Sequence, residues 1–174
     1  VGAIRDAFNK NAFRAAPGVL NQEEVMGWTL QENLMEVDFL EMDRWYIEPY
    51  IVAQLRVDKK TLPSKLFQAH LKLEIKKWCA EKDYERCPTN VKNEIKDRLQ
   101  AEYLSKTHPS VKNVEFCWHV KDGWLIFHST ADGMNDRFLK LFYRSFGLKL
   151  SPISPIEFLG DDVNKRRQLN SSGA

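Results

Sequence analysis

The sequence predicts an α+β fold: an antiparallel or mixed sheet with a long basic two-helix segment and a C-terminal helix packed on the sheet. Three stretches support this prediction: strand-like alternation over residues 45–57, helical periodicity over 62–103, and a hairpin pattern over 111–130 followed by a helix. Strands and helices come in blocks, without the regular alternation that builds a parallel sheet. We expect one domain over residues 1–160, from which 62–105 protrude, and a disordered tail over 161–174.

Two amphipathic helices are predicted between Leu62 and Tyr103. Pro63 suits the first turn of a helix, and Cys87-Pro88 separates the two helical periods. Each helix has one apolar stripe with spacings of three and four residues. The stripes consist of Phe67, Leu71, Ile75 and Trp78 in the first helix and of Val91, Ile95, Leu99 and Tyr103 in the second.

The elements before these helices are less regular. Residues 4–13 have the period of a helix, and residues 21–27 have the pattern of a single capped turn. A strand-like run starts at Trp28, and residues 32–43 predict a loop or an irregular strand. The alternation over 45–57 predicts a half-buried strand. Pro49 marks an edge, a bulge or a break in that strand.

A hairpin and a helix follow the basic segment. Asp122-Gly123 is typical of a tight turn between two strands, and residues 132–146 have a helical period that Gly147 is placed to end. Residues 148–153 predict a short edge strand. The candidate helix caps are Thr61 or Ser64, Thr89 or Asn90, and Thr130.

Positive charge is concentrated in the helical segment. From Arg56 to Lys112 there are 14 Lys and Arg against 8 Asp and Glu, whereas the net charge is −5 over residues 1–55 and +1 over 113–174. Segregated positive charge attracts phosphate polyanions, because binding releases their condensed counterions. Seven acidic residues interrupt this charge between residues 62 and 105. A solvated surface is therefore the alternative interpretation.

The composition is that of a soluble globular chain. Hydrophobic residues make up 43% of the 174 positions, and no apolar run approaches the roughly 20 residues that span a bilayer. The three cysteines, at irregular spacing, argue against a disulfide framework and for free thiols. We expect a cytoplasmic protein without a membrane partner.

No residue pattern predicts a catalytic site, a metal, a cofactor or a small-molecule substrate. Cys117 and His119 share one strand face, but zinc needs four ligands and no second pair has a suitable spacing. Glu74 and Lys76 have the Glu-x-Lys pattern of metal-dependent nucleases, yet residues two apart in a helix diverge by about 200°. The sequence thus predicts a non-enzyme, with a metal-dependent exonuclease as a weaker alternative.

Several short motifs mark the order of these elements. They are the charged turn after the strand, Met26-Gly27-Trp28, Leu62-Pro63-Ser64, Asp122-Gly123, Ser145-Phe146-Gly147 and Pro152-Ile153. With these motifs, the order and spacing of the elements resemble the recombination-associated RdgC family from about Phe13 to Leu159. The chain differs from the family pattern in lacking a first strand before Ile4 and the second half of full-length members.

The resemblance implies a non-catalytic, largely sequence-independent protein that binds double-stranded DNA and modulates recombination. Family members are similar to a clamp in which two subunits encircle the duplex and limit access of the RecA recombinase. It therefore implies a homodimer, recombinase antagonism, and a place in the bacterial nucleoid or a phage origin. Three explanations of the short length stay open: a fragment, a compact phage or bacterial relative, or a domain that dimerises differently.

Seven cations of the two helices are the predicted phosphate contacts. Lysine and arginine neutralise phosphates without reading bases, which suits sequence-independent binding. The alternative function is a protein-interaction or regulatory module whose basic helices bind an acidic partner. The candidate contacts are Lys65, Lys72, Lys76, Lys77, Lys92, Lys96 and Arg98.

Overall fold

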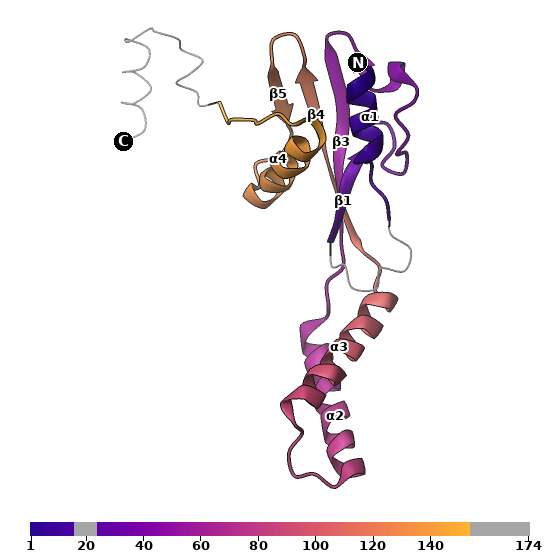
Figure 1. Ribbon diagram of the computed structural model, residues 1–174, viewed down its shortest axis with the longest axis vertical. Coiled ribbons are helices and arrows are strands. Elements are labelled where there is room, and N and C mark those ends of the chain that lie inside the picture. Colours follow the sequence, from indigo (N-terminus) through magenta and orange to yellow (C-terminus); the bar gives the residue numbers. More distant parts are fainter. Residues whose placement is uncertain (16–23, 154–174) are drawn as a thin grey trace, which may run out of the picture.

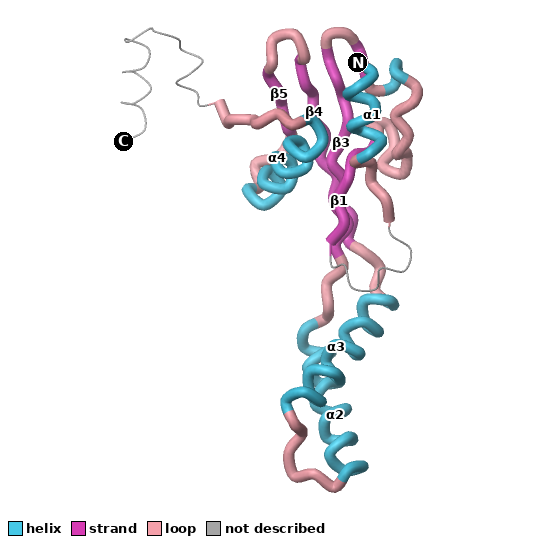
Figure 2. The backbone as a smooth tube through the Cα atoms, in the orientation of Figure 1, coloured by secondary structure: helices cyan, strands magenta, loops and turns pink. Residues whose placement is uncertain are grey.

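Residues 1–15 and 24–153 are described by the computed structural model, and they form helices and one antiparallel sheet (Figures 1 and 2). The helices are α1 (Gly2–Lys10), α2 (Ser64–Lys82), α3 (Thr89–Lys106) and α4 (Asp132–Phe146), with a short 3-10 helix, η1 (Met42–Arg44). The strands are β1 (Glu24–Thr29), β2 (Tyr46–Ile47), β3 (Tyr50–Lys59), β4 (Ser110–His119) and β5 (Trp124–Phe127). The predicted α+β fold class is confirmed.

The sheet is built around β3. Its strand order is β1-β3-β4-β5, every named pair is antiparallel, and β2 pairs with the start of β3. The β3–β4 pair runs without interruption from Tyr50 opposite His119 to Lys59 opposite Ser110. β3 ends at the same end of the sheet where β4 begins, so the chain enters α2 and returns from α3 side by side (Figure 1).

One face of the sheet carries the aromatic core. Trp28 of β1 and Phe116 of β4 lie under α4, and the ring of Phe138 meets both at centroid distances of 5.7 and 5.2 Å. Phe8 of α1 packs on the same cluster, 6.0 Å from the Trp28 ring. The Trp28 indole N–H donates to Ser145 Oγ at 2.8 Å, which satisfies its polar atom inside the core. The C-terminal helix is therefore packed on the sheet, as predicted.

The opposite face of β3 is also buried, so the prediction of a half-buried strand was wrong. Gln54, Arg56 and Asp58 are each at most 8% exposed. Arg56 forms a two-bond ion pair with Asp58 at 2.8 and 2.7 Å, donates to the Leu34 carbonyl at 3.0 Å, and stacks over the Phe13 ring at 4.1 Å. Alternation shows which residues share a face, but a covering loop decides whether that face is dry.

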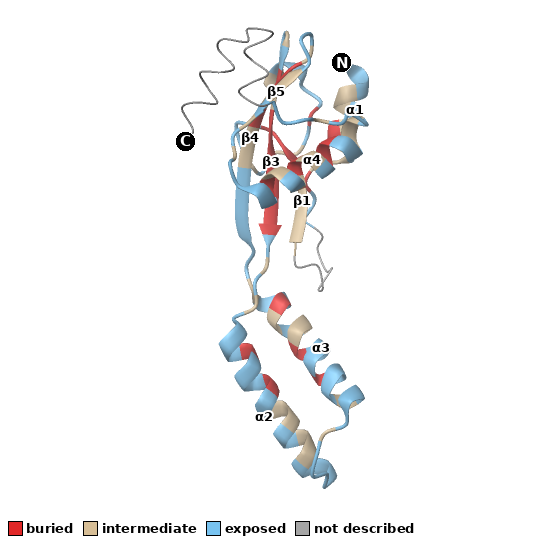
Figure 3. Ribbon diagram, turned by 90° about the vertical axis from the view of Figure 1, so that its left-hand side faces the viewer, coloured by how far each residue is buried: buried red, intermediate tan, exposed pale blue. Residues whose placement is uncertain are grey.

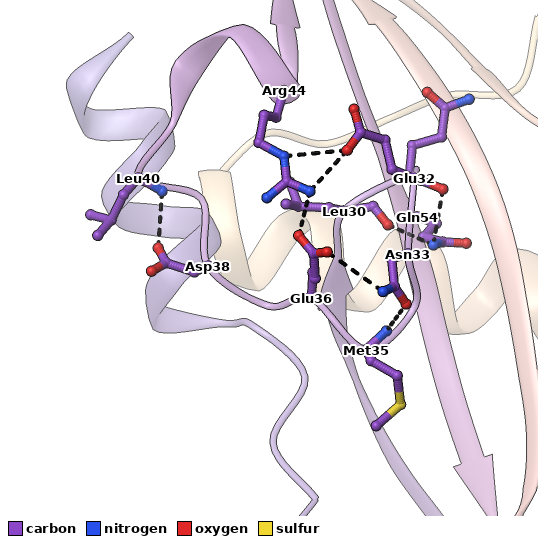
Figure 4. A network of polar contacts seen from close by, with 10 residues as sticks. Leu30, Glu32, Asn33, Met35, Glu36, Asp38, Leu40, Arg44 and Gln54 are labelled. Atoms are coloured by element: carbon purple, nitrogen blue, oxygen red, sulfur yellow. Dashed lines mark hydrogen bonds and ion pairs between the residues drawn. The ribbon is translucent and has the colours of Figure 1, made fainter.

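That covering loop follows β1 and is held by its own polar side chains (Figure 4). Arg44 forms ion pairs with Glu32, at 2.8 Å, and with Glu36. Gln54 of β3 anchors the loop by donating to the Leu30 carbonyl at 2.6 Å, and Gln54 itself accepts from Asn113 of β4 at 2.7 Å. Residues 32–43 are thus a loop up to η1, the first of the two predicted alternatives.

Other sequence predictions need correction. Residues 24–27 belong to β1 and not to a capped turn, because Gly27 lets the Phe13 backbone approach; a Cβ there would lie 2.4 Å from Phe13 Cα. Pro49 separates β2 from β3, which confirms the break, one of the three alternatives predicted for it. Residues 147–153 form no strand in the described part of the chain. Residues 21–23 and the predicted tail over 161–174 lie outside the described residues.

The predicted helix caps were also wrong. The residues at the N-caps are Pro63, Pro88 and Ala131, and within the described chain none of the three helices has a side-chain cap. The C-terminal ends of α2 and α4 are typical of α-helices, since Asp83 and Gly147 adopt left-handed conformations there.

The buried ion pair generates a first prediction. Asp58→Ala leaves the Arg56 charge buried without its partner, so we expect it to lower the free energy of unfolding by about 3 kcal/mol. Arg56→Leu/Asp58→Val removes both charges and should cost less than the single change. Urea denaturation of both variants checks this, and a double variant that is less stable than Asp58→Ala would contradict it.

A second prediction concerns the ion pair between β1 and α4. Arg137 donates to both carboxylate oxygens of Glu24 at 2.6 and 2.7 Å, and these hydrogen bonds hold the pKa of Glu24 below its ordinary value of 4.5. This carboxylate therefore stabilises the fold above about pH 4.5, and the contribution is lost as pH falls through the lowered pKa.

We expect Glu24→Gln to be about 1 kcal/mol less stable than the native chain at pH 7. The difference should shrink on acidification because the native carboxyl becomes neutral as well. Paired urea titrations at pH 7 and pH 3 measure it. A difference that is equal at both pH values would assign the effect to packing and not to charge.

Candidate nucleic-acid interface

Helices α2 and α3, with the connecting residues 83–88, project from the sheet as one antiparallel hairpin, which we call the arm (Figure 1). Its root is tied to the sheet by Lys60, whose ammonium donates to the Leu104 carbonyl at 2.7 Å. Thr107 and Ser105 satisfy two further carbonyls near the end of α3, through bonds to Tyr103 and Glu102. The end of α3 is thus anchored where β4 begins.

The arm has its own small apolar core. Phe67 and Leu71 of α2 meet Ile95 and Leu99 of α3, and all four side chains are at most 7% exposed. Both predicted stripes are confirmed, and buried residues of α2 and α3 lie on the sides that face one another (Figure 3). The residues packed around this core are Ile75, Trp78, Cys87, Val91 and Tyr103.

An ion pair joins the helices along one side. Glu74 of α2 accepts from Arg98 of α3 at 2.8 Å. A cleft of about 320 Å³ follows this side of the arm, and we call this side the ion-pair flank. Its lining residues are Glu74, Lys77, Trp78, Glu81, Val91, Glu94, Ile95 and Arg98.

Helical geometry places three lysines of α2 on the other side of the arm. Successive residues turn by about 100°, so Glu74 lies about 60° from Leu71 in one direction. Lys72 lies about 100° from Leu71 in the opposite direction, and Lys65 and Lys76 follow at about 120° and 140°. These three side chains are exposed. They therefore point away from the ion-pair flank.

Two lysines of α3 lie on the same side. Arg98 is about 60° from Ile95 toward the ion-pair flank, whereas Lys92 and Lys96 are about 60° and 100° away in the other direction. Near the start of α3, burial and the neighbouring Cys79 raise the pKa of the Cys87 thiol, and the nearby charge of Lys92 opposes that shift. We call the five residues the lysine flank: Lys65, Lys72, Lys76, Lys92 and Lys96.

None of the described carboxylates of α2 and α3 lies on the lysine flank. Glu74, Glu81 and Glu94 line the cleft. Glu102 is held by Lys106 at 2.6 Å, and this hydrogen bond lowers the pKa of Glu102. Asp97 lies about 200° from Ile95, on the outer back of α3. The carboxylates of the two helices are therefore separated from these five lysines in space.

The structure divides the seven predicted phosphate contacts. Five of them share the lysine flank, and all seven side chains are exposed. Lys77 and Arg98 lie on the ion-pair flank, where Arg98 is already neutralised by Glu74. The sequence analysis treats these seven basic residues as one group because all of them lie outside the apolar stripes; the angular position of the acids would have separated the two groups.

The residues considered for metal or nuclease chemistry are held in other interactions. Glu74 is paired with Arg98, while Lys76, two residues on, lies about 200° around the helix and belongs to the lysine flank. His119 accepts a hydrogen bond from the Asp122 backbone N–H at 3.0 Å and stacks on Trp124 at 5.0 Å. Burial raises the pKa of the Cys117 thiol. Across residues 1–15 and 24–153, no group of three metal-ligating side chains comes together.

Comparisons with known proteins leave the arm as the main guide to function. No family model and no curated protein matches this sequence. Among the described helices, none has both the length and the apolar character needed to cross a membrane. The distribution of charge on the arm is therefore the observation from which a function can be inferred.

The separate core of the arm generates a third prediction. Leu99→Ala removes one of four buried side chains, which costs about 2 to 4 kcal/mol in a well-packed site. Because the arm touches the main core little, we expect amides of α2 and α3 to lose hydrogen-exchange protection while β3 and β4 keep theirs. Leu73→Ala, at a position 62% exposed on α2, is the control and should change neither region. Equal loss across the sheet would contradict this.

Proposed function

We propose that the arm binds double-stranded DNA through its lysine flank, without catalysis and largely without sequence preference. The observation that carries this proposal is the sorting of charge: five lysines from two helices share one exposed side, and the described helix carboxylates lie elsewhere. Such a surface attracts phosphate, because neutralising a polyanion releases counterions. A surface of the same composition with acids and lysines interspersed would gain much less binding free energy.

The spacing of the lysines suits a nucleic-acid backbone. Lys72 and Lys76 are about 6 Å apart along the helix axis, and Lys65 and Lys72 about 10 Å. Phosphates recur about every 3.4 Å along the axis on each DNA strand, so lysines at these intervals can reach every second or third phosphate. Lysine is a flexible point charge without the planar fork that arginine uses to read guanine. This favours binding that is independent of sequence.

The resemblance to the RdgC family supplies the rest of the proposal. On that basis the chain acts as a homodimer in the bacterial nucleoid or in a phage-infected cell, and its occupation of DNA limits access of a recombinase. The divergence of Glu74 and Lys76 supports a binding protein over the exonuclease alternative, because these groups do not converge on one metal.

Two neighbouring lysines provide the test. Lys76→Gln and Lys77→Gln remove the same charge from adjacent positions of α2, but only Lys76 belongs to the lysine flank. We expect Lys76→Gln to weaken binding of a 30-base-pair duplex roughly threefold to tenfold and to lower the salt slope by about one. Fluorescence anisotropy at several salt concentrations, with two unrelated duplex sequences, measures both quantities.

Lys77→Gln should leave the affinity and the salt slope nearly unchanged. Equal weakening by the two variants would show that only the net charge of the chain matters, and the lysine flank would not be the binding surface. Absence of binding by the folded chain at low salt would remove DNA as its partner.

Exposed leucines on α2 favour a second candidate, a protein-interaction module. Leu66 and Leu73 are seven residues apart, lie on the outer side of the helix, and are 57% and 62% exposed. DNA binding does not explain two such side chains, whereas a partner protein buries them. If an acidic partner uses the same arm, duplex DNA should compete with it. An interaction that DNA leaves intact would assign the partner to a different surface.

A further inference from the structure

A second basic site lies at the root of the arm, between the ends of β3 and β4 and the beginning of α4. It is a pocket of about 450 Å³, within the size range of small-molecule sites. Its lining residues are Glu24, Val57, Lys59, Thr61, Ser110, Lys112, Ala131, Gly133, Met134 and Arg137.

The strand register brings two lysines to one side of this pocket. Lys59 of β3 lies opposite Ser110 of β4, and Val57 lies opposite Lys112. Residues two apart on a strand, and residues paired across strands, share a face. Lys59 and Lys112 are therefore diagonal neighbours on the face that α4 covers. Val57 and Met134, at 3% and 8% exposure, provide an apolar floor beside them.

The charges in the pocket are not balanced. Arg137 and Glu24 neutralise one another through two hydrogen bonds. Lys59 is close enough to Glu24 to contribute to its lowered pKa, although Arg137 is the main cause. Lys112 has no ion-pair partner among the described residues. Three cations thus face one carboxylate, and the lining keeps a net charge of +2.

We propose that this pocket binds a phosphate group, with Lys59 and Lys112 as its cationic ligands. The hydroxyls of Thr61 and Ser110 lie in the same lining and can donate further hydrogen bonds. Phosphate has several acceptor oxygens and two charges, so it uses two ammonium groups and neighbouring hydroxyls better than a single carboxylate does. The volume and the apolar floor accommodate the rest of a nucleotide.

A phosphate can reach the pocket from two sources: a free nucleotide or inorganic phosphate, or a phosphate of DNA bound to the protein. Both use the same chemistry at Lys59 and Lys112. This site does not rest on the proposed function of the lysine flank, because free phosphate can be tested without DNA.

Amide NMR spectra of the native chain, titrated with inorganic phosphate and then with deoxyadenosine monophosphate at constant ionic strength, test the site. We expect saturable shifts at Thr61, Ser110 and Gly133, and about tenfold weaker binding in Lys112→Met. Lys59→Met/Lys112→Met should abolish the shifts. Lys140→Met, an exposed lysine of α4 outside the pocket, is the matched control and should bind like the native chain.

Duplex anisotropy then separates the two sources. If Lys59→Met/Lys112→Met also weakens duplex binding more than Lys140→Met does, the phosphate belongs to DNA; if duplex binding is unchanged while nucleotide binding is lost, the ligand is a free nucleotide. The proposal is overturned if phosphate and deoxyadenosine monophosphate produce no saturable shift, or if the double variant, still folded by its spectrum, binds them as well as the native chain.

Discussion

The packing of Phe67 and Leu71 against Ile95 and Leu99 fixes the rotation of α2 and α3 about their own axes. The direction of every charged side chain on the arm follows from that rotation. If either helix turned by about 100°, one residue, the lysines and acids would mix on the same side. A small apolar core of four buried side chains thus decides whether the arm has one uniformly basic side.

The sheet controls where that side is presented. The unbroken pairing of β3 with β4 delivers α2 and α3 as neighbours, and Lys60 ties the end of α3 back to the root of the arm. β3 itself is held from both faces, by the aromatic core under α4 and by the Arg56–Asp58 pair under the loop after β1. The arm therefore projects from a strand that is fixed on both sides, which suits a surface that must meet an extended ligand.

Much of this architecture could be predicted from local pattern. The stripes of α2 and α3, the Asp122-Gly123 turn and the end of α4 at Gly147 each depend on spacing or on one residue's backbone preference. Features that depend on contacts distant in the sequence could not be predicted. The sequence predicts a capped turn over residues 21–27 because nothing nearby indicates that the Phe13 backbone lies against Gly27. It predicts a half-buried strand over 45–57 because the loop that covers Arg56 is not visible in the alternation.

The candidate interface shows the same limit. Basic character was evident from the sequence, but the seven candidate residues divide into two groups only when the facing direction of each helix is known. Arg98 illustrates the difference: its charge attracts phosphate in the sequence, while in the fold it is committed to Glu74, 24 positions away. Interpretation by composition alone therefore overestimates the number of cations available to a ligand.

Lysine acetylation with mass spectrometry, carried out with and without duplex DNA, tests the central claim most directly because it reports each ammonium group separately. The account predicts that DNA protects Lys65, Lys72, Lys76, Lys92 and Lys96, while Lys77 reacts at the same rate in both samples. Two results would contradict a one-sided basic surface as the site of binding. One is that DNA protects Lys77 as strongly as Lys76; the other is that none of the five lysines is protected under conditions where the duplex is bound.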